Sequence, residues 1–242
     1  MKPVHKHLAA AFALALSLAP AAAWAAASLD TFLADLQPAY DGIRKSMFYL
    51  ERGAVAPAGF EIERSAEAWR SEVLPYAASP PAPFAHDPDF ARTLEGVAAA
   101  LARADTAAGA DAALAAIRGI PDTLAELRAR NHIVVLADHV REANRAMERL
   151  WEYRHRTIDF DDRAAVDELR ARLSVTAYAY GECDRAAPDG VSRRPDFRRI
   201  IDGVTNSLDQ MWDAIAAGDQ QRVVNILREV RSFDRLLWLR HG

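Results

Sequence analysis

Residues 88–97 read PDFARTLEGV, and residues 195–204 read PDFRRIIDGV. The two stretches share the frame P-D-F-x-R-x-[LI]-[DE]-G-V at an offset of 107 residues. Proline, aromatic residue, acid and glycine at identical spacing are harder to explain by composition than helical periodicity is, so the pair indicates an internal duplication. We therefore expect the chain to fold as two tandem units.

Apolar residues recur at steps of three and four along most of the chain, which places them on one stripe of a helix. From Leu29 to Leu50 the steps run 4, 3, 4, 3, 4, 3. The same stepping defines the segments 29–50, 62–76, 90–101, 114–127, 133–150, 166–180, 197–215 and 223–238. No stretch alternates with a period of two, so strands are not expected.

The order of these helical segments repeats, and a proline-bearing loop precedes the third helix of each unit, at 79–83 and 187–190. Four amphipathic helices joined by short turns bury their stripes most simply against one another. The sequence therefore predicts an all-α protein made of two tandem, antiparallel up-down four-helix bundles, residues 28–131 and 132–242.

Two glycines stand at equivalent places in the repeat, Gly96 and Gly203. Both lie inside predicted helices, where glycine costs about 1 kcal/mol relative to alanine. We expect them to mark points of close contact between helices.

Residues 1–27 have the pattern of a secretory signal peptide. Lys2 and Lys6 precede a short apolar run, and an alanine-rich stretch ends in an A-x-A cleavage pattern at Ala27. No later stretch reaches the length of about 18 apolar residues that a membrane span needs. The sequence predicts an exported protein, periplasmic or secreted, without a membrane span after cleavage.

Charge and cysteine content narrow the possible partners. Of the 30 Lys and Arg residues, Lys2 and Lys6 lie in the leader, so that 28 remain against 34 Asp and Glu, a net charge of −6. Nucleic acid is not an expected partner, because binding its backbone needs a basic face. Cys183 is the only cysteine, at the end of a helical stripe, so we expect a buried, inert thiol and no internal disulfide.

Each half resembles the c-prime class of periplasmic cytochromes. The likeness lies in a first helix with I-R-x-x-M, here Ile43, Arg44 and Met47, and in a proline-rich loop before an aromatic-led third helix. A short Ala-Ala-Gly turn then enters a fourth helix that ends in Arg. The resemblance covers nearly the whole chain after residue 27, and it implies a haem protein that transfers electrons.

The motif that defines this family is missing. Its C-x-x-C-H sequence on the fourth helix fixes haem through two thioethers and ligates iron through histidine. The matching positions hold Thr123, Glu126 and Leu127 in the first half and Phe233, Leu236 and Leu237 in the second. Neither half can hold haem covalently, so no cofactor is expected.

Non-covalent haem is the alternative that the resemblance leaves open. Related bundles ligate iron with a methionine on the first helix and a histidine on the last, and Met47 and Met147 stand at the first of these places. His132 and His241 lie at or beyond the ends of the fourth helices, which is a poor position for a bundle interior. Because methionine readily fills gaps in a core, we favour a packing role for both methionines.

Metal and catalytic motifs are weak. His132 and His139 are seven residues apart and would share a helix face, but structural zinc sites use four ligands and catalytic sites three. No nucleophile-base pair or phosphate loop is present, so an enzyme is not expected.

The last helix carries more apolar surface than one stripe needs, including Leu236, Leu237, Trp238 and Leu239. We expect it to pack at the junction of the two units, or against a partner such as a second copy in a dimer. The leading functional hypothesis is a non-catalytic, haem-free binding or interaction module whose protein or small-molecule partner is unknown.

Overall fold

The computed structural model describes residues 28–242, and this part of the chain is helical with no strands. The all-α prediction is confirmed. The predicted signal peptide, residues 1–27, lies outside the described residues. None of the described helices combines the length and the apolar character needed to cross a membrane.

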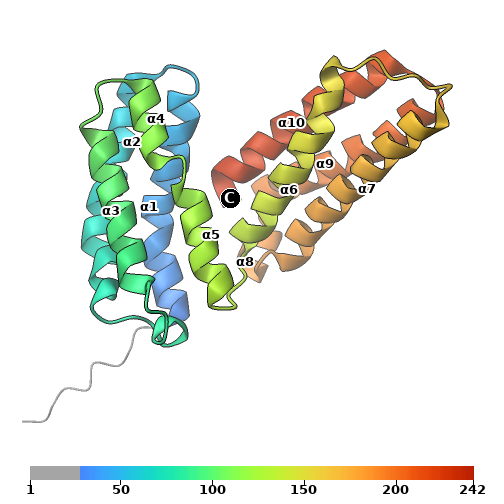
Figure 1. Cartoon of the computed structure of the whole chain (residues 1–242). Coiled ribbons are helices and arrows are strands. Elements are labelled where there is room, and N and C mark those ends of the chain that lie inside the picture. The colour runs from blue at the N-terminus through green and yellow to red at the C-terminus, as the bar shows by residue number, and fades with distance from the viewer. Residues whose placement is uncertain (1–27) are drawn as a thin grey trace, which may run out of the picture.

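Five helices form the first half of the fold (Figure 1), and their bounds are α1 (Leu29–Leu50), α2 (Val55–Ala68), α3 (Phe90–Asp105), α4 (Ala110–Ile117) and α5 (Ile120–Arg130). A π-helical turn (Trp69–Val73) and a 3-10 turn (Leu74–Ala77) extend α2. Pro75 lies in the 3-10 turn and has no N–H with which to continue the ladder of helical hydrogen bonds.

The second half begins with α6 (Leu136–Trp151) and continues with α7 (Arg163–Ala186), α8 (Asp189–Ser192), α9 (Pro195–Ala216) and α10 (Gln220–His241). The long helices α6, α7, α9 and α10 run side by side in Figure 1, and the single turn α8 interrupts the connection between α7 and α9. Asp162 caps α7 and Asp219 caps α10 by accepting backbone N–H groups, which satisfies donors that every helix start leaves free.

Buried apolar side chains form two clusters, one between residues 32 and 133 and the other between 140 and 237. In the first, Phe32 packs edge-on against Phe84, with ring centroids 5.3 Å apart. The buried Trp69 indole donates a hydrogen bond of 3.0 Å to the carbonyl of Leu94. The helical stripes predicted from spacing are therefore the faces that fill these two cores.

The predicted single helix 114–127 is wrong, because the chain bends between α4 and α5 at Arg118 and Gly119. Pro121 has no N–H and cannot continue the hydrogen-bond ladder of α4, so the apolar stripe crosses the bend while the helix does not. Figure 1 shows α5 turned away from α4 toward the second half. The bend thus brings the start of α5 to the junction.

Polar contacts of Arg128 and Arg44 help to join the halves at the junction. Arg128 on α5 holds Asp138 on α6 through two nitrogens, at 3.0 and 2.7 Å. The fully buried Arg44 on α1 donates to the Leu239 carbonyl at 3.3 Å and to the carbonyl of Gly242. Trp238 packs against both cores, which confirms that the last helix lies at the junction.

The two repeat-related glycines have different surroundings. A Cβ added to Gly203 would lie 2.5 Å from the Phe233 ring, whereas one added to Gly96 would meet nothing within 4 Å. The close-contact prediction is confirmed for Gly203 and wrong for Gly96, which is exposed on α3.

We expect Gly96→Ala to raise the free energy of unfolding by up to about 1 kcal/mol, the helix propensity gain. Gly203→Ala makes the same gain, but crowding of Phe233 costs about 1–3 kcal/mol, so this variant is less stable than the parent. Urea unfolding of both variants measures the difference. Equal shifts of the two midpoints would contradict the packing described for Gly203.

Candidate functional site

The predicted ligand residues do not come together. Met147 is fully buried in the second core, whereas Met47, 7% exposed, lies near the end of α1 at the junction. His132 is exposed in the turn after α5 with φ 57°, and His139 is half-buried on α6. Within residues 28–242 no group of three or more His, Cys, Asp or Glu side chains could hold a metal ion.

The leucines at the two positions assigned to an iron ligand are core residues. Leu127 is 1% exposed and Leu237 is 0% exposed, and each belongs to the apolar cluster of its own half. These side chains occupy interior space and offer no atom that ligates iron. The residues present therefore do not fit haem at these positions.

His241 lies at the end of α10, where its ring packs edge-on against Phe197 at 5.1 Å between centroids. Burial lowers its pKa to about 4. It borders an apolar cavity of about 250 Å³ with Leu36, Tyr40 and Val135. Met47 does not line this cavity, so the junction does not pair a methionine with a histidine.

Cys183 is fully buried in the second core, as its place on the helical stripe predicted. Burial raises the pKa of its thiol to about 12. A thiol with such a pKa is protonated at neutral pH, so it is not a nucleophile.

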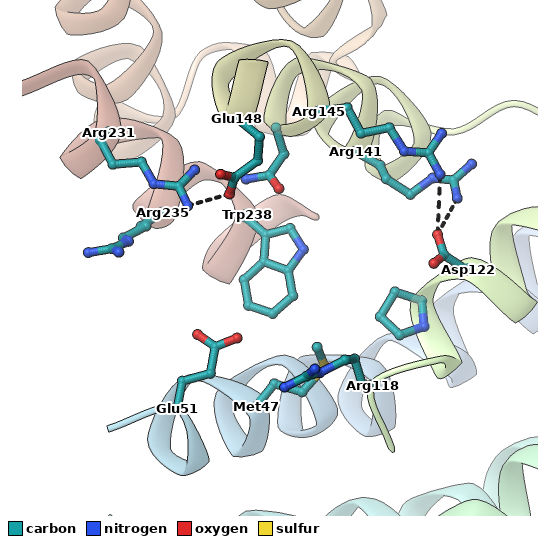
Figure 2. Close-up of a pocket in the computed structure, with 12 residues that line it drawn as sticks. Met47, Glu51, Arg118, Asp122, Arg141, Arg145, Glu148, Arg231, Arg235 and Trp238 are labelled. Atoms are coloured by element: carbon teal, nitrogen blue, oxygen red, sulfur yellow. Dashed lines mark hydrogen bonds and ion pairs between the residues drawn. The ribbon is translucent and has the colours of Figure 1, made fainter. Parts of the chain in front are cut away.

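A cleft of about 310 Å³ lies between the two halves and is lined by many charged side chains (Figure 2). Five arginines line it: Arg118 between α4 and α5, Arg141 and Arg145 on α6, and Arg231 and Arg235 on α10. Figure 2 shows the Trp238 indole projecting from α10 toward Met47 and Glu51 at the end of α1. We call this space the arginine cleft.

Local features of the sequence place these side chains. The bend at Gly119 and Pro121 turns Arg118 and Asp122 toward α6. Arg141 and Arg145 are one turn apart on α6, and Arg231 and Arg235 are one turn apart on α10, so each pair shares a helix face. The cleft wall is therefore built from three helices and one bend.

Ion pairs hold part of the wall in place. Asp122 bridges the halves by accepting from Arg141 at 2.6 Å and from Arg145 at 3.4 Å. Arg231 donates to Glu148 on α6 and, at 3.0 Å, to Asp234 on its own helix. Figure 2 marks the Asp122 and Glu148 pairs with dashed lines.

Two arginines at the cleft have no such partner. Arg118 and Arg235 are exposed, and their guanidinium groups make no hydrogen bond or ion pair within the described part of the chain. The Nε atoms of Arg141 and Arg231 are buried and also lack a hydrogen-bond partner within residues 28–242. Free donor capacity thus remains on both sides of the cleft.

A buried polar network supports the α10 wall. Asp234, nearly inaccessible, accepts from Tyr180 at 2.7 Å through one oxygen and from Asn144 at 2.8 Å and Arg231 at 3.0 Å through the other. Burial raises the pKa of Asp234, and the hydrogen bond from Tyr180 opposes that change. Asn144 and Arg231 also line the cleft, so the network fixes two of its side chains from behind.

The arginine cleft was not predicted from the sequence, because on each helix taken alone its arginines resemble ordinary solvent-exposed charges. The arrangement can bind an anion, since guanidinium groups donate to carboxylate and phosphate oxygens in a planar fork. Its lining residues include no serine, threonine, cysteine, lysine or histidine.

A comparison with known protein families, with curated proteins and with solved structures finds no match for this chain.

Proposed function

We propose that the chain is an exported, non-catalytic binding module made of two tandem c-prime-like four-helix bundles that hold no haem, the fourth helix of the first bundle being divided into α4 and α5. The observation that carries this proposal is the burial of Leu127 and Leu237 in the two cores, at the positions where the resemblance places iron ligands. Side chains fill the space that a porphyrin and its ligand would need.

The duplication is supported by the matching PDF segments and by the position of the two cores. Residues 88–97 lead into α3 in the first half, and residues 195–204 form the start of α9 in the second. Each helix supplies apolar residues to the core of its own half.

The binding role is supported by the arginine cleft. A scaffold that served only to bury its own stripes would not need five arginines around one space at the junction, two of them without partners. Ligand sites are concave, with a few converging polar groups beside apolar ones, and they occur preferentially between domains. Arg118, Trp238 and Met47 at one cleft meet that description.

The absorption spectrum of protein purified from a periplasm that makes cytochromes tests the haem-free scaffold. We expect a colourless protein whose spectrum shows only the absorption band of aromatic side chains at about 280 nm. A Soret band in stoichiometric amount would overturn the proposal and support a haem-binding electron-transfer protein instead.

A further inference from the structure

We propose that the arginine cleft binds a small organic anion that carries a carboxylate on an apolar body. This inference rests on the proposed binding function and adds the chemical class of the ligand.

The charge of the lining side chains is positive. Five arginines stand against three carboxylates, those of Glu51, Asp122 and Glu148, which leaves an excess of two positive charges. Asp234 and Glu142 pair with Arg231 and Arg145 from outside the lining and offset this excess, so the positive charge is concentrated at the unpaired Arg118 and Arg235. Because the whole chain is acidic, this local positive charge is opposite to the net charge of −4, and it favours an anion at this place.

The free donors point to a carboxylate bound by arginine. Arg118 and Arg235 have their guanidinium groups available, and hydrogen bonds from a charged donor to a charged acceptor are among the strongest in proteins. The Nε atoms of Arg141 and Arg231 also lack a hydrogen-bond partner within residues 28–242, but both atoms are buried, so the exposed guanidinium groups carry the argument.

The apolar side of the cleft excludes a bare inorganic anion as the best ligand. The Trp238 indole, the Met47 thioether and the Pro121 ring share the cleft with the arginines. An apolar ligand body covers these groups, whereas phosphate leaves them in contact with water. A volume of about 310 Å³ matches the smallest class of ligand pockets, which run from about 300 to 1,000 Å³.

The ligand would touch both halves of the protein. Arg118 and Met47 belong to the first half, and Arg235 and Trp238 to the second. A molecule held between them stabilises the junction, so its binding raises the thermal midpoint in a concentration-dependent way.

Isothermal calorimetry of the purified protein with 3-phenylpropionate tests the inference. We expect saturable binding with a dissociation constant of about 1 mM or tighter. The uncharged amide, 3-phenylpropionamide, should bind at least about tenfold more weakly because it cannot form charge-assisted pairs. Inorganic phosphate should also bind at least about tenfold more weakly because it has no apolar body.

Arg118→Gln and Arg235→Gln should each weaken phenylpropionate binding by about tenfold, since each removes a charged donor without breaking an ion pair of the fold. The matched controls are Arg103→Gln on α3 and Arg222→Gln on α10, two exposed arginines away from the cleft that make no ion pair within the described chain. These controls should bind as the parent does.

Three results would overturn the inference: no saturable binding of phenylpropionate, equal binding of phosphate or the amide, or binding that survives both cleft substitutions. A colourless protein with any of these results contradicts the ligand class alone. A Soret band contradicts the haem-free scaffold whatever the titration gives, so the two failures are distinguishable.

Discussion

Replacing Asp234 by alanine is expected to lower the free energy of unfolding by about 3 kcal/mol or more, as breaking a buried charge pair from one side does. The carboxylate accepts from Tyr180, Asn144 and Arg231, and all three lose a partner at once. Tyr180 is as deeply buried as Asp234, so no water replaces the lost acceptor there. Arg231 retains its ion pair with Glu148, so we expect the loss in the free energy of unfolding to be close to 3 kcal/mol, about the lower limit for breaking a buried pair.

Asp234→Asn separates charge from volume in the same network. The amide has nearly the size of the carboxylate, and its NH₂ group can donate to the Tyr180 hydroxyl, but the charge-assisted hydrogen bond from Arg231 is lost. We therefore expect this variant also to be less stable than the parent, although it leaves no cavity. Glu229→Ala is the control, because Glu229 is an exposed acid on the same helix with no ion pair in the described chain, and surface changes of this kind stay within about 0.5 kcal/mol.

Urea unfolding followed by circular dichroism measures all three variants. If Asp234→Ala and Glu229→Ala unfold at the same urea concentration, the network contributes nothing to stability. If Asp234→Asn is as stable as the parent, stability depends on the shape of the side chain at position 234 and not on its negative charge.

Helical periodicity predicted much of the secondary structure because each amphipathic stripe is a local pattern. The stripe from Leu29 to Leu50 gives the bounds of α1, and the surplus apolar surface near Trp238 predicted the junction packing of α10. The bend at Pro121 was missed because the apolar spacing continues across it. An apolar stripe indicates which face of the chain is buried, whereas Pro121 indicates where the helical hydrogen bonds are interrupted.

The buried network around Asp234 could have been inferred in part from the helical periodicity of the sequence. Val223, Leu227, Val230, Asp234 and Leu237 step by 4, 3, 4, 3, so that Asp234 takes a place on the apolar stripe of α10. An acid at such a place needs partners on the facing helices. Which partners it finds depends on how α6 and α7 pack, and no local spacing gives that.

The arginine cleft depends on tertiary structure even more strongly. Its arginines come from a bend and from two helices, and the arginines of those two helices are 90 residues apart along the chain. Each of them alone is indistinguishable from a solvated charge on a helix face. Only the docking of the two halves, through Arg44 and Arg128, brings them around one space.

Leu237→Ala is expected to lower the free energy of unfolding strongly, and it tests whether the second core is filled by side chains without haem. Leu237→Ala removes a side chain that is 0% exposed in the second core, next to the junction helix face that carries Trp238. Leucine to alanine changes in tightly packed cores cost about 2–5 kcal/mol, the sum of lost burial and the cavity left behind. We expect a loss in this range by urea unfolding.

Leu236→Ala is the matched control, since Leu236 is the preceding residue on the same helix and is 39% exposed. Its substitution removes the same atoms from a partly solvated place and should cost less than half as much. The contrast separates two descriptions of the bundle. A scaffold that keeps a porphyrin-sized space would lose little at Leu237, because the side chain would border that space. A scaffold packed with its own side chains loses several kcal/mol, on the order of a third of the stability of a small domain.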